Sequence, residues 1–172
     1  MYAQFLCGTR RYDDSVAAAR TALNMQPSMG VASNALECAF GSKGMSDEHL
    51  AFQRERFAGD TELLVALERG LSEAGYEGAQ RSMGDFLEAR REKSGKVRGP
   101  GFGPMGIAPK YLFAGDYDRT IDWMEKCYEA RIPDMLYLGR PHWDLFRSNP
   151  RFQDLLRRMN LPSKTARVGN HL

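Results

Sequence analysis

The chain has 172 residues and a net charge of +2, with 42% hydrophobic and 27% charged residues. This length suits a single domain or a short array of repeats, and the composition excludes both a disordered chain and a membrane protein. No apolar run reaches the roughly 18 residues of a transmembrane helix, and the first residues lack the features of a signal peptide, so we expect no association with a membrane.

Breaks that contain glycine or proline divide the chain into short segments. Within these segments apolar residues recur at positions i, i+3, i+4 and i+7, as in 17–25, 63–71, 83–87 and 121–128. No stretch alternates between apolar and polar residues as a half-buried strand would. The sequence therefore predicts an all-α protein whose helices are joined by short turns.

The segments repeat with a period of about 34 residues. Tyr12 and Tyr117, each followed by an aspartate, begin similar segments and lie 105 residues apart, or three steps of 35. Turns at Gly44 and Gly75 lie between them, and acidic residues follow each turn, where they favour the dipole of a new helix. We expect helix pairs over about 1–28, 30–59, 61–94 and 103–133.

The end of the chain predicts one further helix. Ser148 or Asn149 can cap it and Pro150 suits its first turn, which places the helix at about 149–160. Pro109 interrupts the preceding repeat, so the first helix of that repeat either begins near this residue or is kinked there. The residues expected to pack around the terminal helix are Trp143, Phe146, Phe152, Leu155, Leu156 and Met159.

These features resemble the tetratricopeptide repeat (TPR) family, in which each repeat is a pair of antiparallel helices with small residues where the helices cross. The second and third repeats match less well, since Glu37 and His49 stand where a small residue is usual. The first repeat matches at Ala3, Leu6, Tyr12, Ser15, Ala19, Ala22 and Pro27. The fourth matches at Ile107, Ala108, Tyr111, Gly115, Asp116, Tyr117, Thr120, Met124, Cys127 and Pro133.

The segment 138–159 is similar to the ending common to TPR regions of bacterial signalling proteins, which follow adenylate cyclase, serine/threonine kinase or winged-helix regulator domains. The resemblance implies a right-handed α-solenoid of about four antiparallel helix pairs with a C-terminal capping helix. This single domain would cover 1–162, followed by a flexible tail over 163–172. The chain would then belong to a larger bacterial signalling or regulatory protein.

Members of this family usually bind ligands in a concave groove lined by the first helix of each pair. The resemblance therefore implies a non-enzymatic scaffold that binds a peptide, a partner protein or a neighbouring domain of the same polypeptide. The lysine and asparagine set that holds acidic C-terminal tails is absent, which favours an amphipathic or partly apolar peptide. The groove residues implied here are Gln4, Asn34, Cys38, Arg69, Ser72, Leu112 and Phe113.

The cysteines and histidines do not form a recognisable metal or catalytic motif. Cys7, Cys38 and Cys127 are odd in number and widely spaced, and no histidine stands at ligand spacing from any of them. We expect reduced thiols, a cytoplasmic location and neither a metal nor a cofactor. Because no nucleophile–base pair is visible, we do not expect an enzyme.

Aspartates and tyrosines recur at one position of the repeat. Asp13 and Asp14 correspond to Asp116 and Asp118, which favours helix starts over a catalytic or metal-binding carboxylate pair. Recurrence likewise favours a packing role for the tyrosines. These tyrosines are Tyr12, Tyr76 and Tyr117.

Two other segments could carry function. The glycine-rich segment 99–106 lacks the pattern of a phosphate-binding loop and favours a flexible connection between repeats. His142 lies beside Trp143, and we interpret this pair as part of a turn before the last helix.

Charge is distributed unevenly along the chain. Residues 1–89 carry 8 basic and 13 acidic residues, a net charge of −5, whereas residues 90–172 carry 16 and 9, a net charge of +7. A basic half can attract nucleic acid, so the alternative function is a nucleic-acid-associated regulatory module. The densest basic run, 90–98, is more typical of a solvated helix end, and nucleic acid is therefore not the expected partner.

Overall fold

The computed structural model describes residues 2–94 and 106–162, and the regular structure of these residues is helical throughout. The all-α prediction is confirmed for this part of the chain. The glycine-rich stretch 99–105 and the tail 163–172 lie outside the described residues. The elements are α1 (Tyr2–Gly8), α2 (Tyr12–Met25), α3 (Gly30–Lys43), α4 (Ser46–Arg56), α5 (Thr61–Ser94), α6 (Ile107–Phe113), α7 (Tyr117–Glu129), two 3₁₀-helices, η1 (Pro133–Gly139) and η2 (Pro141–Phe146), and α8 (Pro150–Arg158).

Tight turns at glycines join α3 to α4 and α6 to α7. Gly44 between α3 and α4 and Gly115 between α6 and α7 have φ angles of 69° and 70°, a conformation that glycine adopts without strain. After the first of these turns the chain reverses, and α4 packs against α3. The contact between the two helices is seen in the rings of Phe40 on α3 and Phe52 on α4, whose centroids lie 6.2 Å apart. The predicted turns therefore lie where the chain reverses.

The helix α5 is itself a pair of antiparallel helices. Its backbone leaves helical geometry at Ala74 and Gly75, and Gly75 has a φ of 63°. Arg90, near the end of α5, donates to Asp60 just before its start, at 2.5 and 2.7 Å. Such a contact across 30 residues requires a reversal midway, as predicted at Gly75.

Small residues allow the two halves of α5 to approach closely. A Cβ atom added to Gly70 would overlap the carbonyl oxygen of Gly78, and one added to Gly78 would overlap the carbonyl oxygen of Gly70. Any larger residue at either position would have to push the two halves apart. Small residues at a helix crossing are the feature on which the TPR resemblance was based.

The capping of α8 resolves an alternative that the sequence left open. The Asn149 side chain accepts hydrogen bonds from the backbone N–H groups of Arg151 and Phe152, at 2.9 and 3.3 Å, so Asn149 rather than Ser148 is the N-cap. The helix predicted over 149–160 is confirmed as Pro150–Arg158. Pro109 is the third residue of α6, where its missing N–H has no partner to lose, so α6 begins near Pro109 and is not kinked by it.

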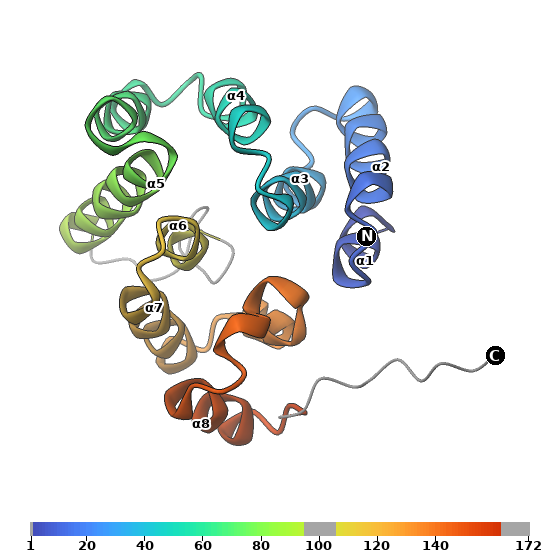
Figure 1. Cartoon of the computed structure of the whole chain (residues 1–172), viewed down its shortest axis with the longest axis vertical. Helices are drawn as coiled ribbons and strands as arrows, with labels where there is room; N and C mark the ends of the chain where they lie inside the picture. Colours follow the sequence, from blue (N-terminus) through green and yellow to red (C-terminus); the bar gives the residue numbers. More distant parts are fainter. Residues whose placement is uncertain (1, 95–105, 163–172) are drawn as a thin grey trace.

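The helices follow one another around the molecule (Figure 1). Two hydrophobic cores lie among them. The smaller core, which we call the N-terminal core, lies among α1, α2 and α3 and is built of Ala3, Ala19, Ala32, Ala35, Leu36 and Phe40. The larger C-terminal core extends from α4 to α8 and includes Trp123, Trp143, Phe146 and Phe152, each at most 2% exposed. As expected, Trp143 and Phe146 pack near α8, and the rings of Phe146 and Phe152 lie 5.9 Å apart.

The segment before α8 closes the arc of helices. Its two 3₁₀-helices bring Asp144 to Arg10 near the N-terminus, with 2.5 Å between Oδ2 and Nη2, and bring His142 to Cys38 on α3. Ion pairs of this kind are weak when exposed, so this pair marks the approach of the two ends rather than causing it.

The expectation of three reduced thiols is wrong. Cys7 on α1 and Cys38 on α3 form a disulfide, and only Cys127 is a free cysteine among the described residues. The two cysteines lie 31 residues apart in the sequence, so their spacing did not indicate the pairing. The helices α1 and α3 come into contact only in the folded chain. The disulfide also removes the reason for expecting a cytoplasmic location.

Candidate functional site

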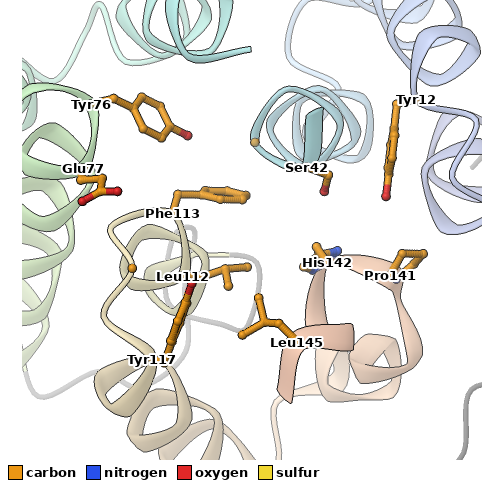
Figure 2. Close-up of a pocket in the computed structure, with 12 residues that line it drawn as sticks. Tyr12, Ser42, Tyr76, Glu77, Leu112, Phe113, Tyr117, Pro141, His142 and Leu145 are labelled. Carbon is orange, nitrogen blue, oxygen red and sulfur yellow. The ribbon is translucent and has the colours of Figure 1, made fainter. Parts of the chain in front are cut away.

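The site that we consider is a pocket on the inner side of the arc, between the two cores (Figure 2). Its volume is about 380 Å³. Five helices and the start of α2 contribute to its wall, so it exists only because the chain closes on itself. The lining residues are Tyr12, Gly41, Ser42, Tyr76, Glu77, Leu112, Phe113, Gly115, Tyr117, Pro141, His142 and Leu145.

Aromatic side chains from four helices form much of the wall. Tyr12 and Tyr117 are the first residues of α2 and α7, and Tyr76 follows the reversal in α5, so each enters the pocket from beside a turn. Figure 2 shows the three tyrosine hydroxyls directed toward the interior from different sides. Tyr117 is 51% exposed and its ring also packs edge-on against Phe146.

A glycine allows Phe113 to form the floor of the pocket. A Cβ atom added to Gly41 of α3 would overlap the ring of Phe113, so the ring lies directly against the α3 backbone. The other side of Phe113 meets His49 edge-on, with 5.4 Å between ring centroids. The position of Phe113 is therefore fixed from both sides.

His142 presents an unpaired nitrogen at the pocket. The residue is 8% exposed, and its Nδ1 lies 3.3 Å from Cys38 Sγ. A disulfide sulfur has no proton to donate, so Nδ1–H is the donor and Nε2 carries the lone pair. Nε2 is buried and has no hydrogen-bond partner. Burial, together with the charge of Arg140, lowers the pKa of His142 to about 3, which keeps the ring neutral at pH 7.

Two further polar groups at the pocket lack partners. Ser42 Oγ is buried without a hydrogen bond. Glu77 is exposed, and its carboxylate makes no ion pair with any described residue. No lysine or arginine is among the lining residues, so the polar groups of the pocket are neutral or acidic.

Behind the pocket wall, a hydrogen-bonded chain orients Tyr76. Gln53 and Gln80 exchange amide hydrogen bonds of 3.2 and 2.8 Å, and Gln53 Nε2 also donates to His49 Nε2 at 3.0 Å. His49 Nδ1–H then donates to the Tyr76 hydroxyl oxygen at 2.8 Å, which leaves the tyrosine proton free to point into the pocket. Burial, and next the charge of Glu37, raises the pKa of Tyr76 above its usual value, so the hydroxyl stays protonated.

A buried ion cluster holds α6, and with it Phe113, against α3 and α4. Glu37 accepts hydrogen bonds from Lys110 Nζ at 2.7 Å and from Arg56 Nη1 at 3.0 Å. Burial alone would raise the pKa of Glu37, but the charges of Lys110 and Arg56 outweigh it and hold the pKa well below its usual value. Glu37 and His49, the two departures from the repeat pattern, therefore form this support.

The structure brings together some of the implied groove residues and separates the others. Leu112 and Phe113 line the pocket, and Asn34, Cys38 and Phe113 line a small cavity next to it. The other three lie apart from both cavities. These are Gln4 on α1 and, on the first half of α5, Arg69, which bonds to Ser82, and Ser72, which donates to the Arg69 carbonyl.

The sequence interpretation missed the main pocket residues. It assigned the three tyrosines to packing and His142 to a turn, whereas all four line the pocket. The recurrence of tyrosine directly after a turn was a usable signal, because Tyr12, Tyr76 and Tyr117 all line the pocket. Asp116 agrees with the interpretation of the aspartates as helix starts, because its side chain accepts a hydrogen bond from Arg119 N at 3.2 Å and caps α7.

The part of the chain that the structure describes contains no group of three or more histidine, cysteine, aspartate or glutamate side chains placed to hold a metal ion. Within the same residues, none of the helices is long and apolar enough to span a membrane. No family model matches the chain, and no match is found among curated proteins or among solved structures.

Proposed function

We propose that this chain is a non-enzymatic interaction module, a right-handed TPR-like solenoid that binds a peptide segment of its partner in the central pocket. The observation that carries the proposal is the pocket itself. Its volume of about 380 Å³ is within the usual range of ligand sites, it has aromatic walls, and it presents buried polar atoms without partners. The segment belongs to a partner protein or to a neighbouring domain of a larger regulatory protein.

The order of the helices supports the TPR-like arrangement. Four helix pairs follow one another, α1–α2, α3–α4, the two halves of α5, and α6–α7, and α8 covers the end of the series. Glycine or alanine lies at the closest approaches, as at Gly70 and Gly78. A pocket on the inner side of such an arc corresponds to the groove in which repeat proteins of this kind bind peptides.

Two observations favour binding over the other functions considered. The sulfur that contacts His142 belongs to a disulfide and is not a thiolate, so this contact is not a nucleophile–base pair. Several described basic side chains of the second half are paired with carboxylates, as Arg119 is with Asp85 and Glu88, which reduces the charge offered to nucleic acid.

The proposal is tested by selecting peptides from a random twelve-residue library on the intact chain under non-reducing conditions. Leu145 is 49% exposed and lines the pocket, so Leu145→Trp fills the site without disturbing a core. Leu136 is 67% exposed on the neighbouring 3₁₀-helix and lies outside the pocket, so Leu136→Trp is the matched control. We expect selected peptides to bind the wild type and Leu136→Trp equally and to bind Leu145→Trp at least about tenfold more weakly. Selected peptides that bind all three proteins alike would contradict the proposal.

A further inference from the structure

We infer that the pocket selects a lysine or arginine side chain of the bound peptide. This inference rests on the proposed function and specifies the chemistry that the same site recognises. It follows from three features of the pocket wall: an unpaired acceptor, an unpaired carboxylate and aromatic faces that no cation covers.

The first feature is His142 Nε2, an acceptor that is buried and unpaired. Nδ1–H of the same ring donates to the disulfide sulfur of Cys38. Nε2 can therefore become a donor only if that contact breaks or the ring takes up a second proton. An unpaired buried acceptor is costly, and a ligand that brings an N–H group removes the cost. Both an ammonium and a guanidinium group offer several such donors.

The second feature is the carboxylate of Glu77. Most carboxylates around it in the sequence are paired, as Glu68 is with Arg54 and Glu88 is with Lys126, but Glu77 pairs with no described residue. Figure 2 shows the carboxylate beside Tyr76 and directed toward Phe113. A cationic ligand would have a counter-charge there, whereas a carboxylate or phosphate ligand would meet repulsion from Glu77 and no basic side chain among the lining residues.

The third feature is the set of aromatic faces. Elsewhere in the protein, cations cover tyrosine rings: Arg119 lies 4.0 Å from the ring centroid of Tyr111, and Arg158 lies 4.1 Å from that of Tyr128. Among the described residues no lysine or arginine covers the three pocket tyrosines or Phe113. A cation from the partner can occupy these faces, and its aliphatic stem can lie along Leu112 and Leu145.

The inference is tested with the peptides obtained in the selection. Each lysine is replaced by norleucine and each arginine by citrulline, which removes the charge while keeping the carbon chain of lysine and the shape of arginine. Affinities for the intact chain are measured by fluorescence anisotropy. We expect one basic position in each peptide to be required, with about a tenfold loss of affinity on neutral replacement.

Protein variants locate the effect in the pocket. Glu77→Gln should weaken binding of the basic peptides about fivefold and leave the neutral versions unchanged. Glu73→Gln alters an exposed carboxylate that does not line the pocket, and it should change neither. Peptides that need Leu145 but bind equally well after neutral replacement would overturn this inference and leave the proposed function standing. Failure to select any pocket-dependent peptide would instead contradict the proposed function.

Discussion

The two cores of the molecule are built from different materials. The N-terminal core relies on alanines and is joined by the Cys7–Cys38 disulfide, whereas the C-terminal core is filled by tryptophan, phenylalanine and leucine side chains. Burial of large side chains contributes far more per residue than burial of alanine, so packing stabilises the C-terminal core more strongly than the N-terminal core. The N-terminal helices α1 and α3 are joined by a covalent link, and the pocket lies where these two regions meet.

The largest expected effect comes from opening the C-terminal core. Phe152 is fully buried on α8, and Phe152→Ala should lower the free energy of unfolding by about 4 kcal/mol. Urea denaturation followed by circular dichroism measures this loss. Leu136→Ala, at an exposed position, should change stability by no more than about 0.5 kcal/mol. Equal losses for the two variants would show that α8 does not seal the core.

Loss of the Cys7–Cys38 disulfide should destabilise the helices around the N-terminal core. The double variant Cys7→Ser/Cys38→Ser opens a loop between residues 31 positions apart and should lose about 3 kcal/mol. Hydrogen exchange should become faster in α1, α2 and α3 and stay slow in α7 and α8. A reducing agent should destabilise the wild type in the same way and have no further effect on the double variant. Uniformly faster exchange would indicate one cooperative unit rather than two regions.

Protonation of His142, which lies at the boundary between the two cores, should make the free energy of unfolding depend on pH. The pKa of His142 falls from an unfolded value near 6.5 to about 3, so the unfolded state binds an extra proton between these values. The contribution of His142 is complete above pH 6.5 and is lost as the pH falls toward 3, by at most about 1.4 kcal/mol per pH unit. The lowered pKa values of His49 and Glu37 act in the same direction.

The comparison of wild type with His142→Gln isolates this contribution. Glutamine keeps a polar side chain at the site but does not titrate. The free energy of unfolding, measured between pH 4 and pH 7, should fall less steeply for the variant than for the wild type as the pH is lowered. Parallel curves would assign the pH dependence to the other buried groups.

The smallest expected effect is at the cap of α8. Asn149→Ala removes two hydrogen bonds to backbone N–H groups and should cost about 1 kcal/mol. Ser148→Ala is the control, since the Ser148 side chain is exposed and does not cap the helix. The two variants distinguish the candidates that the sequence alone offered, with thermal unfolding as the measurement. A larger loss from Ser148→Ala would reverse the assignment.

Local signals in the sequence predicted most of the helices. Glycine at Gly44, Gly75 and Gly115 marks the turns because a positive φ favours it, and these positions were identified without knowledge of any tertiary contact. The start of α8 was predicted from Asn149 and Pro150 for the same reason. Such features depend on neighbours only a few residues away in the chain.

The site was harder to predict because it depends on how far the arc closes. Cys38 meets His142 across 104 residues, and Lys110 meets Glu37 across 73. Whether residues so far apart in the sequence meet depends on the sum of many small angles between helices, and no local pattern specifies that sum. Residues that seemed ordinary in their local sequence, such as Tyr76 and His142, come to line one pocket only through this closure.

Gly41 has a consequence for how the pocket could differ between related chains. Because Gly41 has no side chain, the ring of Phe113 can lie directly against α3. The absence of a Cβ atom at Gly41 therefore sets the width of the pocket opening. A related chain with alanine at the equivalent position would have to tilt the phenylalanine ring into the cavity. Preference for ligand size would then change through a residue with no direct bond to the ligand, and alanine or serine at this position in a homologue would mark a narrower site.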